Sequence, residues 1–327
     1  MVINILILLV LNVIILRNNK KIFEFAGIFD YPIEKRKIHN NPISLSGGLI
    51  ILLSFIISII LITNDKNLFE NSLIIFFSIS FYLIGYFDDK NNIKPLKKTI
   101  LNIFLIILFL LLSKQFILSD LKSIYLNKTI QLENYGILFT MFCFITFLNA
   151  LNMYDGINGQ SGIYILFVII YFFVLTQKEI FLLMTIPILF FLYMNFKNKC
   201  FLGNSGVTFV SFIILVFFID NYKQGYFSSV EEILVIMILP GIEMIRLFFF
   251  RILKSKNPFY ADNFHIHHLL LNYFNPLKVV TINSFLAISP IIFYKIFNYS
   301  YLVILCFLIL YFFLIFYFKL ILLNRKL

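Results

Sequence analysis

Long apolar runs alternate with short polar segments along almost the whole chain. An α-helix needs about 20 apolar residues to cross the hydrocarbon core of a bilayer, and in lipid only helices and closed barrels satisfy their own backbone hydrogen bonds. The runs predict eleven transmembrane helices, over 2–16, 44–63, 68–86, 100–118, 135–151, 162–176, 179–196, 205–222, 230–250, 277–297 and 300–320. We therefore predict an all-α, polytopic transmembrane helical bundle that forms a single integral membrane domain over residues 1–327.

The composition excludes a water-soluble protein. Of the 327 residues, 61% are hydrophobic and 13% are charged, whereas a soluble domain averages about 45–50% apolar and about 25% charged residues. The three cysteines lie far apart, which argues against a disulfide framework or a zinc site. The run 2–16 has no basic residue before it and no small-residue cleavage site after it, so we interpret it as a retained helix and not a signal peptide.

The basic residues are distributed unequally between the two sides of the predicted bundle. With eleven spans, 20 of the 27 Lys and Arg residues fall on one side, and the 16 acidic residues divide equally, so that the two sides carry net charges of +12 and −1. The positive-inside rule makes the basic side cytoplasmic, with the N-terminus outside and the C-terminus in the cytoplasm. Basic loops beside a membrane attract anionic lipid. The sequence has no basic stripe interleaved with aromatic residues of the kind that would indicate nucleic acid binding.

The residues that can carry chemistry gather in five polar loops, all on the predicted cytoplasmic side. These loops are 17–48, 85–99, 149–161, 197–206 and 246–276. Asp88 and Asp89 are adjacent carboxylates at the end of a span, and Mg²⁺ prefers such oxygens together with water and substrate phosphates. Lys90, Lys97, Lys98 and Arg251 suit anionic oxygens, and the glycine-rich turns of the third and fourth loops allow a ligand close to the backbone. Together they predict a magnesium-dependent diphosphate site at the membrane face, where one substrate is a lipid phosphate.

Each motif alone also has a structural interpretation. Adjacent aspartates at a helix end are typical of a solvated cap, and an Asn-rich turn such as 149–159 is often purely structural. The histidine tract is more specific, because His265, His267 and His268 fall within four residues and such tracts bind metals or anions. It does not predict zinc, since no cysteine accompanies it and its spacing does not face one side of a helix.

In order and content, the five loops resemble those of the polyprenyl-phosphate N-acetylhexosamine-1-phosphate transferases (glycosyltransferase family 4), and most closely the WecA-like branch. The resemblance runs from about Asp30 to His268. It implies transfer of a sugar-1-phosphate from a UDP-amino sugar to undecaprenyl phosphate with release of UMP, the initiating step of cell-envelope polysaccharide synthesis such as that of O-antigen. It also implies Mg²⁺, with Mn²⁺ as the alternative metal, a location in the bacterial inner membrane with the active site facing the cytoplasm, and a capacity to form homodimers.

The resemblance also implies roles for individual residues. The catalytic candidates are Asp88, Asp89 and Asp155, and the candidate metal ligands are these three with Asn204. The candidate substrate-binding residues are Lys97, Asn152, Asn158, Arg251, His265, His267 and His268.

The chain departs from the family pattern at three positions. Asn158 and Asn204 stand where most members carry aspartates, and Glu243 stands where an aspartate is usual. Because the amide of Asn204 brings no charge to the metal site, we expect weaker Mg²⁺ binding or reduced activity.

Two other functions remain as alternatives. A transporter or flippase would place ionisable residues near the bilayer midplane, whereas here the spans are almost free of charge and the polar motifs lie at one face. Pro187, Pro240 and Pro290 interrupt spans, but neighbouring helices tolerate such kinks. The second alternative is a degenerate family member that binds the nucleotide sugar without turnover, as Asn158 and Asn204 suggest.

Overall fold

The structure, a computed structural model, describes residues 1–32, 41–255, 257 and 264–324. The predicted loop 17–48 is therefore described at its two ends, and the loop 246–276 without 256 and 258–263. Lys35, Arg36, Lys37 and His39 of the first loop lie outside the described residues, as does Asp262 of the fifth.

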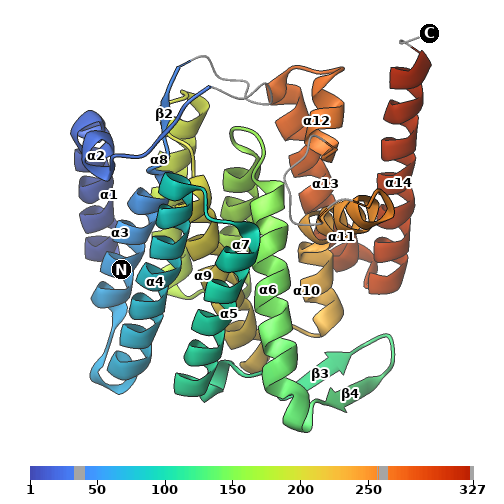
Figure 1. Cartoon of the computed structure of the whole chain (residues 1–327). Coiled ribbons are helices and arrows are strands. Elements are labelled where there is room, and N and C mark those ends of the chain that lie inside the picture. The colour runs from blue at the N-terminus through green and yellow to red at the C-terminus, as the bar shows by residue number, and fades with distance from the viewer. Residues whose placement is uncertain (33–40, 256, 258–263, 325–327) are drawn as a thin grey trace.

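The described chain is almost entirely helical (Figure 1). The helices are α1 (Val2–Arg17), α2 (Asn19–Ala26), α3 (Gly47–Ile62), α4 (Leu68–Asn91), α5 (Pro95–Leu112), α6 (Gly136–Tyr154), α7 (Gln160–Thr176), α8 (Glu179–Phe196), α9 (Gly203–Lys223), α10 (Val230–Ile236), α11 (Ile238–Leu253), α12 (Ile266–Leu271), α13 (Pro276–Phe297) and α14 (Ser300–Asn324). Three 3₁₀ turns, η1 (Asp65–Asn67), η2 (Lys114–Phe116) and η3 (Glu133–Tyr135), and four short strands complete the described elements.

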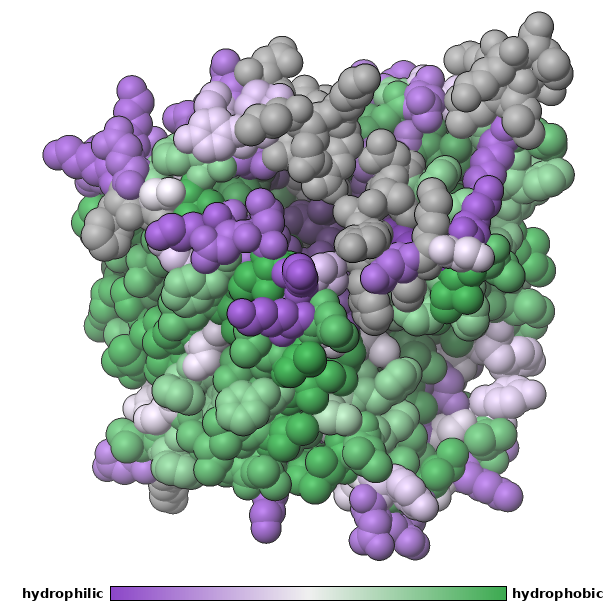
Figure 2. All heavy atoms as spheres, in the orientation of Figure 1, coloured by the Kyte–Doolittle hydropathy of each residue, from purple (hydrophilic) through white to green (hydrophobic). Residues whose placement is uncertain are grey.

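The helices confirm an all-α polytopic membrane protein. Within the described residues, seven are long and apolar enough to cross a bilayer, namely α4, α5, α6 with η3, α8, α9, α13 and α14. The pair α10 and α11 passes the same test as one bent span, and α1, α3 and α7 are shorter apolar helices. On the face shown in Figure 2, a broad apolar band lies between two more hydrophilic ends. The number of eleven spans and the side of each terminus stay predictions.

Three predicted boundaries differ from the structure. Helix α4 continues to Asn91, so Asp88 and Asp89 lie on its last turns and not in a loop. The helix observed in place of the predicted span 100–118 lies closer to the N-terminus: α5 begins at Pro95 and ends at Leu112. The predicted span 230–250 is broken at Met237, where α10 and α11 meet at 74°. Pro240 explains the break, since proline has no N–H to donate to the preceding helical turn.

Helix α9 is the centre of the bundle, and most of its residues are buried. The ring of Phe212 on α9 lies 4.5 Å from Phe81, 5.0 Å from Phe109 and 5.9 Å from Phe144, which come from α4, α5 and α6. Such close packing, and not a hydrophobic driving force, holds helices together in lipid. The middle of α9 is therefore held by helices on several sides.

Glycines allow two neighbouring helices to approach the start of α9. A Cβ atom on Gly48 of α3 would lie 2.3 Å from Cα of Gly206, and one on Gly85 of α4 would lie 2.3 Å from the carbonyl oxygen of Asn204. Small residues at such crossings let helix backbones come close together. Both crossings lie at the same end of the bundle as the polar loops.

Two small antiparallel hairpins lie at opposite ends of the bundle (Figure 1). Strands β1 (Phe29–Asp30) and β2 (Ile43–Ser44) pair beside α8, and Ser44 forms a further parallel bridge with Cys200. Strands β3 (Asp120–Ser123) and β4 (Lys128–Gln131) form the second hairpin. The first hairpin thus ties the loop that follows α2 to the segment that precedes α9.

Candidate functional site

The end of α4, the first turn of α5 and the start of α9 bring three polar side chains together. The ammonium group of Lys98 donates to Oδ2 of Asp88 at 2.8 Å and to Oδ1 of Asn204 at 3.0 Å. The side chains of Lys98 and Asp88 are 17% and 12% exposed. Low exposure strengthens their electrostatic interaction relative to that of a surface pair.

Asp89 caps helix α9 from a different helix. Its Oδ1 accepts from the backbone N–H of Asn204 at 2.9 Å and its Oδ2 from that of Ser205 at 3.0 Å. The first N–H groups of a helix have no partners inside the helix, and a carboxylate there also interacts favourably with the helix dipole. Asp89 therefore positions the segment that carries Asn204. Its role in catalysis and metal binding stays a prediction.

The end of α6 joins the same cluster. The side-chain amide of Asn152 donates to Oδ1 of Asn204 at 2.9 Å. Three residues further on, the half-buried Asp155 accepts a hydrogen bond from the hydroxyl of Ser161. Burial raises the pKa of Asp155 to about 6, the bond from Ser161 lowers it, and the charge of Asp89 raises it. This carboxyl therefore changes its protonation state within the range in which enzymes work.

The remainder of the Asn-rich turn packs on α8. The side-chain amide of Asn158 donates to the carbonyl of Asn195 at 3.1 Å and contacts Oδ1 of Asn198 at 2.5 Å, while the N–H of Gly159 donates to Oδ1 of Asn195 at 2.6 Å. These contacts match the structural interpretation of an Asn-rich turn. A substrate contact by Asn158 stays a prediction.

The histidine tract lies directly against the turn that follows α6. A Cβ atom on Gly156 would come within 2.1 Å of Nε2 of His267, so only glycine fits there without displacing the ring. The ring centroid of His267 lies 5.1 Å from that of His265 and 4.4 Å from that of His268. The third and fifth predicted loops are thus in contact, although more than a hundred residues separate them in the sequence.

His267, which lies against this turn, and Arg251 of α11 are both buried. Burial lowers the pKa of His267 well below its ordinary value, and the charges of His265, His268 and Arg246 lower it further. His267 is therefore neutral at pH 7 and can donate one hydrogen bond and accept another. Arg251 is 4% exposed and lies on the last turn of α11.

The arrangement offers oxygen donors but no preformed cage for a metal. Among residues 1–32, 41–255, 257 and 264–324, no three His, Cys, Asp or Glu side chains lie close enough to one another to hold an ion. Mg²⁺ commonly binds through one or two carboxylates together with substrate phosphates and water. The donors present, which are carboxylates and one amide oxygen, fit that mode of binding.

Sequence reasoning counted both Lys97 and Lys98 as suited to anionic oxygens but chose only Lys97 as a substrate-binding candidate. Lys97 is exposed, and the adjacent Lys98 makes the contacts to Asp88 and Asn204. Sequence reasoning missed Tyr311, a buried tyrosine within the apolar run of α14 that hydrogen-bonds Glu243. Sequence alone cannot tell which of two adjacent lysines faces the site, because that depends on where the helix begins. No motif surrounds Tyr311, so no sequence signal could have identified it.

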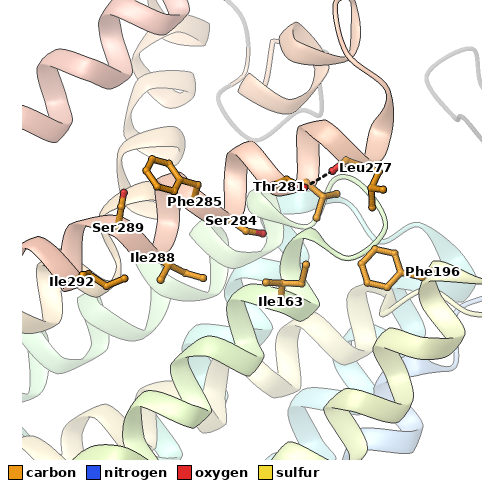
Figure 3. A pocket seen from close by; sticks show the side chains of 10 residues that line it. Ile163, Phe196, Leu277, Thr281, Ser284, Phe285, Ile288, Ser289 and Ile292 are labelled. Atoms are coloured by element: carbon orange, nitrogen blue, oxygen red, sulfur yellow. Dashed lines mark hydrogen bonds between the residues drawn. The ribbon is translucent and has the colours of Figure 1, made fainter.

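An apolar groove lies near the polar site described above. It has a volume of about 420 Å³ and is lined by Ile163 of α7, Phe196 of α8 and a row of residues on α13. Figure 3 shows Thr281, Ser284 and Phe285 of α13 among the side chains that line it. Among the residues that the structure describes, no charged side chain lines the groove, so it suits hydrocarbon and not phosphate.

Comparisons with known proteins match this chain to one family. The sequence model described as Glycosyl transferase family 4 matches residues 71–221, a range that includes Asp88, Asp89, Asp155 and Asn204. This match confirms the resemblance inferred from the five loops.

Individual relatives cover most of the chain. The undecaprenyl-phosphate alpha-N-acetylglucosaminyl 1-phosphate transferase of Escherichia coli (strain K12) is 25% identical over 266 residues, which are 77% of this chain and 71% of that protein. The phospho-N-acetylmuramoyl-pentapeptide-transferase of Thermotoga maritima is 24% identical over 246 residues, 70% of this chain and 78% of that protein. The chain is thus similar to membrane transferases along most of its length.

Proposed function

We propose that this chain, which resembles Glycosyl transferase family 4 over residues 71–221, transfers an N-acetylhexosamine-1-phosphate to a polyprenyl phosphate. The observation that carries the proposal is the convergence of Asp88, Lys98, Asn152 and Asn204 from four helices at one end of an apolar bundle. A lipid phosphate would meet acidic, cationic and amide groups there without leaving the membrane.

The proposed donor is a UDP-amino sugar and the proposed acceptor is undecaprenyl phosphate. An oxygen of the lipid phosphate forms a bond to the phosphorus that carries the sugar, the bond from that phosphorus to the bridging oxygen breaks, and UMP leaves with the electron pair. Such transfers depend mainly on positioning and on neutralising the oxygens. Lys98 would neutralise the lipid phosphate, and the tract from His265 to His268 would bind the diphosphate.

We further propose that Mg²⁺ assists the reaction. Asp88, Asp155 and Asn204 are the proposed donors. Both oxygens of Asp89 hold backbone N–H groups at the start of α9, whereas Oδ1 of Asn204 accepts from the side chains of Lys98 and Asn152 and would exchange one of these bonds for the ion. When bound, the ion supplies Lewis-acid stabilisation of negative charge on phosphate oxygens. The hydrogen bond from Ser161 orients the carboxylate of Asp155 whether or not an ion is bound.

The cellular setting belongs to the same proposal. The excess of basic residues on one side supports a cytoplasmic face for the site, where nucleotide sugars are made. We also propose an inner-membrane location and a reaction that initiates an envelope polysaccharide, and the similarity to an undecaprenyl-phosphate alpha-N-acetylglucosaminyl 1-phosphate transferase supports both. Homodimer formation stays a prediction.

Release of UMP tests the proposed function. Purified protein in detergent would be incubated with Mg²⁺, undecaprenyl phosphate and a panel of UDP-sugars, and UMP and lipid-linked product would be measured together. We expect both in equal amounts and only when the lipid phosphate is present. Nucleotide binding without UMP would support the degenerate family member, and sugar or lipid transport without UMP would support the transporter.

The variant Asn204→Asp tests the placement of the metal donors. An added carboxylate beside Asp88 should lower the Mg²⁺ concentration for half-maximal rate by on the order of tenfold, since ligand charge sets the affinity of such sites. The carboxylate would also keep Lys98 and Asn152 as partners, because both donate to Oδ1 of Asn204. A titration of rate against Mg²⁺ measures the shift, and an unchanged midpoint would contradict this placement.

A further inference from the structure

Two backbone groups on either side of His265 are held by side chains of α11. Nη2 of Arg246 donates to the carbonyl oxygen of Phe264 at 2.8 Å, and the N–H of Ile266 donates to Oε1 of Glu243 at 2.8 Å. Arg246 and Glu243 also pair with each other at 2.9 Å. The position of the backbone around His265 therefore depends on the side chains of Glu243 and Arg246.

A tyrosine from α14 links the same two charges. Nε of Arg246 donates to the hydroxyl of Tyr311 at 2.6 Å, and that hydroxyl donates to Oε2 of Glu243. Tyr311 is 0% exposed and Glu243 is 2% exposed. Hydrogen bonds strengthen one another in such a water-free environment. Loss of one partner would leave the remaining charged groups buried without a full set of hydrogen bonds, which costs free energy of folding.

Helix α14 also contacts the other end of α12. The hydroxyl of Tyr273, two residues beyond α12, donates to the carbonyl oxygen of Phe318 at 2.8 Å, and the two rings lie 5.1 Å apart. Because α12 has only six residues, it has little stability of its own. Its orientation is therefore set by its neighbours, which are α13 and α14 and, through Glu243 and Arg246, α11.

We propose that Glu243, Arg246 and Tyr311, which we call the positioning triad, hold the histidine tract where it meets the diphosphate of the nucleotide sugar. This inference rests on the proposed function. The triad contacts the backbone at His265 and reaches the substrate only through the tract, so its members are positioning residues. It predicts a specific defect: binding of the nucleotide sugar weakens, while binding of the lipid phosphate at Lys98 does not.

The variant Tyr311→Phe removes the hydroxyl and leaves the ring. We expect KM for the UDP-sugar to rise about tenfold, the size of effect that one hydrogen bond to a charged group can have, while KM for undecaprenyl phosphate stays unchanged. The matched control is Tyr317→Phe, which removes the same hydroxyl from a residue of α14 that is 47% exposed. We expect both of its KM values to equal those of the unmodified protein.

Reactivity of the histidines provides a second measurement that needs no turnover. Diethyl pyrocarbonate should modify the tract several times faster in Tyr311→Phe than in Tyr317→Phe, as read by mass spectrometry of the peptide from the tract. Arg246→Met should accelerate modification in the same way. Equal rises in both KM values, or equal reactivity of the three proteins, would overturn the inference. If the unmodified protein releases no UMP, the proposed function fails, and the reactivity comparison still decides whether the triad positions the tract.

Discussion

Replacement of Asp155 by asparagine is expected to lower the rate of sugar-1-phosphate transfer by about 10³-fold, the upper range for loss of one electrostatic group in an active site. The same change should make the folded protein more stable at pH 8. Both effects have one cause. The carboxylate that we propose as a metal donor is partly buried, and burial is the main reason that its pKa is raised to about 6.

The sign of the stability change follows from the raised pKa. The carboxyl of Asp155 has an ordinary pKa of 3.8 in the unfolded chain and about 6 in the folded protein. Ionisation therefore favours unfolding, and the loss of stability develops as the pH rises from about 4 to 6. A shift of two units corresponds to about 3 kcal/mol, and because the side chain is only half-buried we expect about 1–2 kcal/mol at pH 8.

Thermal unfolding in detergent at pH 8 and pH 4.5, together with initial rates of UMP release, checks both effects. Asp155→Asn should unfold at a higher temperature than the unmodified protein at pH 8, and the difference should largely disappear at pH 4.5. The control is Asp65→Asn, which changes an exposed aspartate at the start of η1 and should leave rate and stability unaltered. Full activity of Asp155→Asn would contradict its proposed role, and lower stability at pH 8 would contradict the raised pKa.

Replacement of Lys98 by methionine should also reduce the rate by about 10³-fold. The ammonium group bonds Asp88 and Asn204 at once, and in our proposal it neutralises the phosphate that attacks. Groups that stabilise charge as it develops in phosphoryl transfer have effects of this size. KM for undecaprenyl phosphate should rise as the rate falls, because in our proposal Lys98 binds the lipid phosphate before as well as during the transfer.

Lys97→Met is the decisive comparison, since Lys97 was the only lysine among the substrate-binding candidates chosen from the sequence. Its side chain is exposed, so we expect a change within about twofold, as for most surface substitutions. Initial rates of the two variants, measured with the same substrates, choose between the lysines. A larger loss in Lys97→Met than in Lys98→Met would contradict the assignment made from the structure.

The transmembrane helices could be predicted from sequence because lipid leaves the backbone few options. Each apolar run in water-free surroundings has to satisfy its own N–H and C=O groups, and a helix does so within one segment. Helix boundaries were less predictable. Asp88 and Asp89 extend α4 instead of ending it, since their side chains find Lys98 and the first N–H groups of α9 as partners.

The contacts that the predicted site residues make could not be predicted from sequence, because they depend on how the helices pack. Lys97 and Lys98 differ by about 100° around α5, and only the contact with Asn204 distinguishes them. Tyr311 lies in an apolar run of α14, where sequence reasoning treats aromatic residues as lipid-facing. Pro240 marked the break between α10 and α11, but the angle of 74° depends on how the neighbouring helices pack.

The central position of α9 has a consequence for how the protein responds to its surroundings. Within its apolar window 89% of the residues are buried, against 17% for α5 and for α14. Acyl chains of the surrounding lipid therefore touch the outer helices and hardly reach the one that carries Asn204. Changes in bilayer thickness should tilt α5 and α14 first, so the oxygen donors at the start of α9 keep their spacing across membranes of different composition.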